Sequence, residues 1–237
     1  MSSLFQTSKT INRADILAAT ALVVVLGVAR RPPDAGHPWG HAKAEYFSAG
    51  FHGALTVASG AGVLVYAVTS AIVPPEASRL GVAAVYSLGA LALNFGLSIL
   101  LLRAARLYDS PALEADARHN LADVWTTVGA WLGLSVASAT GWWVLDPIIA
   151  ALVGLHIIRA GYTVLRGAVD GLMDASLPGD ELDRIGDIIR SNMGSALEFH
   201  GLRARKASDQ TFIEFHLVVA GRESVERAHQ LCDDLEA

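Results

Sequence analysis

The sequence has little of what a disulfide-stabilised or nucleic-acid-binding protein needs. It contains a single cysteine among 237 residues, so no internal disulfide can form, which fits a reducing compartment for any exposed part. Only 17% of the residues are charged, the net charge is -5, and no basic patch suited to DNA or RNA is present. The first residues show no clear signal-peptide pattern. These absences exclude a disulfide scaffold and argue against a nucleic-acid partner.

Hydrophobic residues, in contrast, are abundant, at 52% of the chain with a mean hydropathy of +0.40. A helix needs about 20 apolar residues to cross a bilayer, so we searched for segments of that length. Four segments qualify and a fifth, Ile16–Ala29, is marginal. The four are Phe47–Val73, Leu80–Leu102, Leu121–Ala139 and Trp142–Leu165. The fold class predicted for residues 1–174 is therefore a polytopic α-helical membrane domain with about five transmembrane helices in contact with lipid.

Basic residues between these segments predict how the domain is oriented. They gather in the first loop, after the third segment and at the end of the last one, at Arg30, Arg31, Lys43, Arg103, Arg106, Arg159 and Arg166. Loops rich in lysine and arginine stay in the cytoplasm. We therefore expect the first loop, the third loop and the C-terminal tail to be cytoplasmic.

The tail, residues 175–237, has the pattern of a small soluble domain. A helical run over Glu181–Met193 precedes two alternating segments, "LEFHGLRARKA" and "QTFIEFHLVVA", and a helix from Ser224 onward. This pattern predicts a small C-terminal α+β domain. A sheet of two strands is marginal alone, so it needs helix packing or a partner subunit.

The strongest chemical signal lies in "EADARHNLADVWTTVGAW", where Asp116, His119, Asn120 and Asp123 share one helical face. An ionisable group inside a bilayer costs on the order of 3 kcal/mol, so such groups usually face a cavity, a partner or an ion. His119 and Asp123, one turn apart, can reach one cation. The alternative is a polar helix start at the membrane surface, which Asp116 fits best because an acidic side chain favours a helix N-terminus.

Asp15, at the start of the marginal segment, has two interpretations. It can be the N-cap of the following helix, or a metal ligand that joins His119 and Asp123 at the start of the segment Leu121–Ala139. Nitrogen and oxygen donors from two helices suit zinc and its neighbours. The position one turn earlier is Ile11, which cannot coordinate a metal.

The first loop contains "DAGHPWGHAKAE", in which Asp34, His37 and His41 follow one another at spacings of three and four. Two histidines and an aspartate within eight residues form a candidate metal site, and an ordinary polar loop is the alternative.

Four separated motifs resemble the cation diffusion facilitator family over nearly the whole chain. They are "RRPPDAGHPWGHAKAEY", "SPALEADARHNLADVWTTVG", "LDPIIAALVGLHIIRAG" and the tail motif "FHGLRAR...FIEFHLVVA...ERAHQL". The resemblance implies six spans, a homodimer, and export of a divalent cation in exchange for protons. It also implies that both ends of this sequence are incomplete, since the family's first span and last strand have no counterpart here.

The resemblance assigns the metal ligands as three groups. The transport site falls on Asp15, His119 and Asp123, with Ile11 in place of a fourth ligand, and the cytoplasmic loop site falls on Asp34, His37 and His41. A metal site of the dimeric tail falls on His200, His216 and His229. His52 and His156 match no ligand of the family, and we expect them to be packing or pore-lining residues.

The predicted function is therefore a secondary transporter, and not an enzyme, that exports zinc or another divalent transition metal across a bacterial plasma membrane. A member that binds metal and dimerises without transport is the main alternative, favoured by Ile11. A membrane metalloenzyme is a third interpretation, because three ligands and an open position describe a catalytic zinc site. No base or nucleophile stands beside that site in the sequence.

Overall fold

A computed structural model describes residues 20, 22–72, 81–142 and 144–236. The chain divides into two compact units, Met1–Leu172 and Met173–Ala237. Asp15 and Ile11 lie outside the described residues, as do residues 16–19 and 21 of the marginal first segment, whose residues 22–29 are helical.

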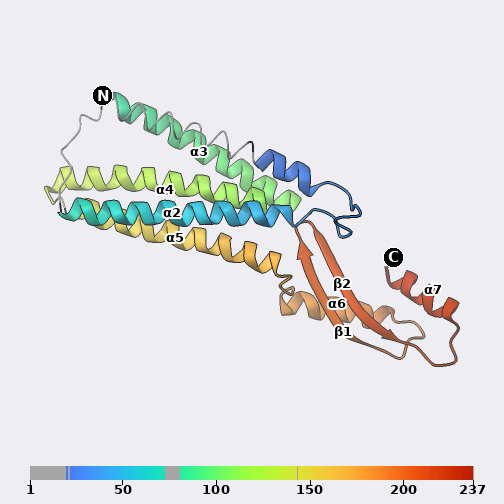
Figure 1. The fold of residues 1–237 in the computed structure, drawn as a ribbon. Helices are drawn as coiled ribbons and strands as arrows, with labels where there is room; N and C mark the ends of the chain where they lie inside the picture. Colours follow the sequence, from blue (N-terminus) through green and yellow to red (C-terminus); the bar gives the residue numbers. More distant parts are fainter. Residues whose placement is uncertain (1–19, 21, 73–80, 143, 237) are drawn as a thin grey trace. The chain divides into compact units, whose positions relative to one another are not determined.

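Four long helices form most of the described part of the first unit, beside the short helical stretch 22–29 and the loop that follows it. They are α2 (Ala44–Ile72), α3 (Gly81–Tyr108), α4 (Pro111–Thr140) and α5 (Leu145–Leu172). Helix α4 packs against both α2 and α5, and α3 runs along α4 (Figure 1). A mostly helical unit followed by a small domain with a two-stranded sheet confirms the predicted fold class.

Three described helices are long and apolar enough to cross a membrane: Ala44–Ile72, Leu91–Tyr108 and Leu145–Leu172. Each of the four helices is longer than the segment predicted from hydropathy. The difference is largest for α4, which begins at Pro111 rather than at Leu121 and is not among those three. Its first half carries the polar residues around His119, which lower its apolar character, and places them well inside the helix.

Helices α2 and α5 pack closely and antiparallel because glycines line their contact. A Cβ atom at Gly53 would lie 2.8 Å from the backbone nitrogen of Leu165, and one at Gly60 would lie 2.9 Å from the backbone oxygen of Gly154. Small residues let helix backbones approach within van der Waals contact, which drives association where lipid offers no hydrophobic effect. The N-terminal end of α2 therefore lies beside the C-terminal end of α5.

The interior and the outside of this bundle differ in residue size. Ala49, Ala115 and Ala168 meet in the core, one from each of α2, α4 and α5. Large apolar side chains such as Phe47 and Leu93 are exposed instead. Exposed large hydrophobic residues on long apolar helices are what a lipid-facing surface requires.

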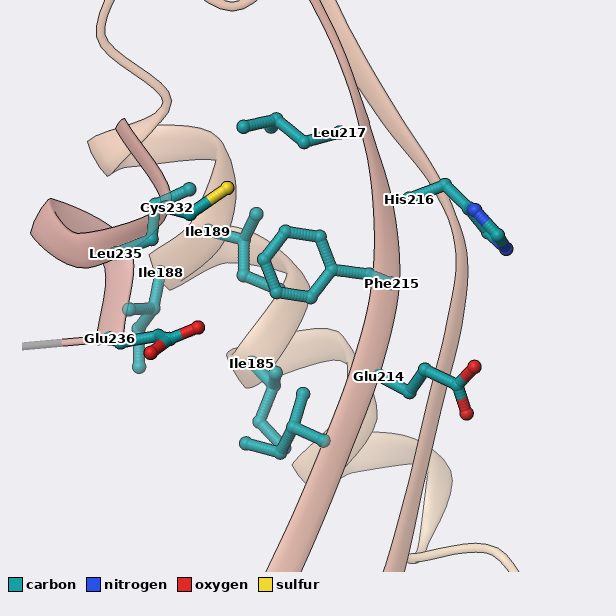
Figure 2. Close-up of a pocket in the computed structure, with 11 residues that line it drawn as sticks. Ile185, Ile188, Ile189, Glu214, Phe215, His216, Leu217, Cys232, Leu235 and Glu236 are labelled. Atoms are coloured by element: carbon teal, nitrogen blue, oxygen red, sulfur yellow. The ribbon is translucent and has the colours of Figure 1, made fainter. Parts of the chain in front are cut away.

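The second unit contains α6 (Gly179–Asn192), β1 (Glu198–Ala207), β2 (Gln210–Val218) and α7 (Val225–Glu236). The strands form an antiparallel two-stranded sheet, as predicted. Figure 2 shows one face of β2 turned toward the helices, with Phe215 beside Ile189 of α6 and Leu235 of α7 across the pocket. His216 points away from these helices, so the histidine face and the apolar face of the sheet are separate.

Candidate metal sites

The first candidate site lies in the loop before α2. One donor atom each of Asp34, His37 and His41 lies within 4.8 Å of the other two. Each oxygen of the Asp34 carboxylate lies near one histidine. Oδ1 is 3.4 Å from His37 Nδ1, and Oδ2 is 3.4 Å from His41 Nε2. The structure therefore brings together the three residues that the spacing predicted. Metal binding by them remains a prediction.

The loop backbone shapes this cluster. The backbone N–H groups of Gly36 and His37 donate to Asp34 Oδ1 at 2.8 and 2.7 Å, an aspartate-closed turn. Gly40, with a φ of +82°, changes the direction of the chain in this loop. His41 follows it, three residues before the start of α2. The N–H of His37 above all, and that of Gly36, hold the pKa of Asp34 below its usual value, with desolvation acting in the opposite direction. Asp34 is therefore ionised and able to accept a cation at neutral pH.

The second candidate site lies inside the bundle, between α2 and α4. His119 Nδ1 is 3.1 Å from the hydroxyl of Thr56, which is 2% exposed. The Thr56 hydroxyl also donates to the carbonyl of His52 at 2.8 Å, which uses its only hydrogen. With its hydrogen on that carbonyl, the hydroxyl oxygen accepts from His119 Nδ1–H, and we assign this tautomer to His119 from the pattern of contacts. This tautomer leaves the Nε2 lone pair of His119 for a metal.

Asp123 follows His119 by one turn of α4, a rise of about 6 Å along the helix axis. It is half-buried, and its carbonyl accepts a hydrogen bond from the Thr127 hydroxyl at 2.9 Å. The predicted third ligand, Asp15, lies outside the described residues. The structure thus gives the orientation of His119, while the complete transport site remains a prediction.

His52, which we expected to be a packing or pore-lining residue, also lies in this region. It is 2% exposed, and its Nδ1 lies 3.5 Å from Asp116 Oδ1. Asp116 is 15% exposed and stands on the second turn of α4, near the helix start where the simpler interpretation placed it, and its carboxylate faces the buried His52. The only signal in the sequence is the spacing of His52, four residues before Thr56 and therefore on the same face of α2.

The third candidate site is in the second unit. His200 and His216 are directly opposite each other on β1 and β2, with their rings stacked 5.1 Å apart. A bulge follows His200, where Gly201 passes so close that a Cβ atom would lie 2.8 Å from the His216 ring. His229, on α7, is 78% exposed and 3.8 Å from Asp233.

The predicted tail site is thus only partly brought together. Among the described residues, no group of three donor atoms within 4.8 Å of one another includes His229 with the strand pair. Metal binding by these three histidines remains a prediction.

Both units match models of known families. Residues 10–173 match the cation efflux transmembrane domain, and residues 177–237 match the cytoplasmic domain of cation efflux proteins. The two matches together cover nearly the whole chain.

Relatives with assigned names agree with these matches. An uncharacterized transporter of Synechocystis is 37% identical over 220 residues, which are 92% of this chain and 71% of that protein. The cation-efflux pump FieF of Shewanella oneidensis is 30% identical over 226 residues, 95% of this chain and 76% of that protein. The manganese efflux system protein MneP of Bacillus subtilis is 25% identical over 230 residues, 94% of this chain and 76% of that protein.

Proposed function

Because this chain belongs to the cation efflux family, we propose that it exports a divalent transition-metal ion, zinc before others, from the cytoplasm in exchange for protons. Members of the family are integral membrane transporters rather than enzymes, and their C-terminal domain is cytoplasmic. Family membership supports export of a divalent cation. The choice of zinc and the exchange for protons are our proposal beyond it.

The observation that supports this proposal best is the orientation of His119. Thr56 holds the ring by Nδ1, so Nε2 is the donor available for a metal, one turn from the carboxylate of Asp123. An imidazole nitrogen beside a carboxylate suits zinc, whereas manganese prefers sites made of oxygen. The manganese efflux protein among the relatives makes manganese the competing substrate.

Proton exchange follows from the same donors. A metal ion needs a neutral imidazole and an ionised carboxylate, so protons and metal compete for His119 and Asp123. When the site opens to the outside, protons bind to His119 and Asp123 and displace the metal ion. The returning protonated site then delivers protons to the cytoplasm.

The orientation of the bundle in the membrane follows from the order of the helices. The N-terminal ends of α2 and α4 and the C-terminal end of α5 lie at one end of the bundle, since α2 is antiparallel to α5 and Thr56 of α2 meets His119 of α4. The cytoplasmic domain follows α5 directly, so this end faces the cytoplasm. Asp34, His37 and His41 immediately precede α2, where they would gather ions for export.

The tail is proposed to join two copies of the chain. The stacked pair His200 and His216 lies on the sheet face that is turned away from α6 and α7 (Figure 2), where a second subunit can supply further ligands. A zinc-dependent homodimer in a bacterial plasma membrane is the expected form of the protein. The bacterial relatives support that location.

A member that binds metal without transporting it is the alternative, because Ile11 stands where the resemblance places a ligand. Zinc flux into proteoliposomes, with a pH dye inside, separates the two. Uptake of zinc accompanied by proton release from the lumen, and slower uptake of manganese, is the expected result. Zinc binding by the purified protein without any uptake would establish the alternative.

A further inference from the structure

We propose that His52 and Asp116 form an additional cation-binding site inside the bundle, which the exported ion occupies between the loop and the His119–Asp123 pair. This inference rests on the proposed export function. It assigns a role to a buried histidine that is otherwise unexplained.

The distance between the two groups is that of two ligands on one metal ion. His52 Nδ1 and Asp116 Oδ1 are 3.5 Å apart. Two donors at about 2.1 Å from a tetrahedral zinc lie roughly 3.4 Å from each other. Both histidine-to-aspartate distances of the loop cluster are 3.4 Å as well.

A direct hydrogen bond does not explain the contact. His52 is 2% exposed, and its Nδ1 has no hydrogen-bond partner among the described residues. Burying a polar nitrogen without a partner costs about 1–3 kcal/mol. A cation held between this nitrogen and the carboxylate of Asp116 would satisfy both groups.

This site is distinct from that of His119. The rings of His52 and His119 are 6.0 Å apart, and Thr56 holds the Nδ1 of His119. No three donor atoms of the described part of the bundle lie within 4.8 Å of one another. The ion at His52 and Asp116 would therefore have two protein ligands and complete its coordination with water. Such binding is weak enough for the ion to leave, as a pathway requires.

The location fits a step of entry. Helix α2 begins at Ala44, just after His41, and His52 lies eight residues further along it, a rise of roughly 12 Å. Along α4, Asp116 lies three residues before His119, a rise of roughly 4.5 Å. Both helices run inward from the end that carries the loop cluster, so the pair is reached after the loop and before His119.

Nitrogen NMR tests the site directly, because it measures the resonances of the histidine ring nitrogens. The full-length protein, labelled at its histidines, is titrated with zinc in detergent. Asp123→Ala serves as the background, because it disables the deeper pair. The His52 signals are identified by their loss in His52→Ala. We expect zinc to shift the Nδ1 resonance of His52, and Asp116→Asn to remove that shift.

Two outcomes would overturn the site. In one, the His52 resonance stays in place at zinc concentrations that shift the resonances of His37 and His41, which act as the internal control. In the other, zinc shifts it equally in Asp116→Asn. Neither outcome depends on transport, so a failure of the proposed function is recognised separately, by absent zinc flux in wild-type proteoliposomes.

Flux measurements then test the role in entry. His52→Ala and Asp116→Asn should each raise the zinc concentration for half-maximal flux about tenfold, at the lower end of what loss of a supporting group costs a metal site. The maximal rate should be retained, and the double variant should resemble the single ones. His156→Ala, which changes a histidine that contacts Trp125 instead, should behave as wild type. Unchanged half-saturation in both variants would remove the pair from the pathway.

Discussion

The loop cluster (Asp34, His37 and His41) and the bundle site (His119 and Asp123) both offer imidazole nitrogens and carboxylate oxygens, but they are built in different ways. Asp34, His37 and His41 lie within eight residues, and a turn closed by Asp34 brings them together. Thr56 and His119 are 63 residues apart, and only the packing of α2 against α4 makes them neighbours. The loop site is local and its Asp34 and His37 are exposed, whereas the bundle site is half-buried and depends on tertiary structure. Changes to helix packing should therefore affect the second site and spare the first.

The largest effect should come from the contact between α2 and α5. Gly53→Leu places a side chain against the backbone of Leu165, which cannot move aside, so we expect the bundle not to assemble. Gly62→Leu is the matched control, because a Cβ atom there has no neighbour within 4 Å. Size-exclusion chromatography and thermal unfolding in detergent compare the two. Equal behaviour of both variants would contradict the close α2–α5 packing.

The next effect concerns the hydrogen bond that orients His119. Thr56→Val keeps the shape of the side chain but removes the hydroxyl, and should weaken zinc binding in the bundle by about 10–100-fold. Thr56→Ser keeps the hydroxyl and should bind zinc nearly as wild type does. Isothermal titration of both variants, with the loop histidines replaced, measures this difference. A purely packing role predicts the reverse order, with valine better than serine.

In the loop, Asp34→Asn should have a smaller and more local effect. The amide oxygen can still accept the backbone N–H groups of Gly36 and His37, so the turn persists while the charge is lost. We expect zinc binding at the loop to weaken about tenfold or less, with no change in the melting temperature of the bundle. A marked fall in melting temperature would show that the loop site is not independent of the helices.

The smallest effect should come from His229. Its side chain is largely exposed and close to Asp233 only at 3.8 Å, a contact of little energetic weight. His229→Ala should change the zinc concentration for half-dimerisation by less than about threefold, whereas His216→Ala should abolish the dependence on zinc. Mass photometry can follow both. An equal loss in the two variants would place His229 among the ligands of the dimer.

The difference between the two clusters also explains what the sequence could predict. The loop residues were found because their spacing and the turn residues around them are local. The histidine pair on the strands was named from the family resemblance, and the hairpin register places the two residues opposite each other. The helices were predicted in place but too short, since hydropathy weights composition rather than hydrogen bonding.

The roles of His52 and Thr56 could not be predicted, because each depends on a residue of α4 more than 60 positions away. The start of α4 was predicted ten residues late, because its first turns are polar and hydropathy does not detect them. Nothing in the composition of α2 shows which of its faces meets α4.

The central claim is that the half-buried pair His119 and Asp123 on α4 carries the ion, while the loop residues only gather it. Zinc flux into proteoliposomes, measured over a range of zinc concentrations for Asp123→Ala, His119→Ala and His37→Ala, tests this directly. We predict almost no maximal rate in the first two variants, and for His37→Ala a higher half-saturating concentration with the maximal rate preserved. Wild-type maximal rates in Asp123→Ala and His119→Ala, together with a lost maximal rate in His37→Ala, would contradict the account.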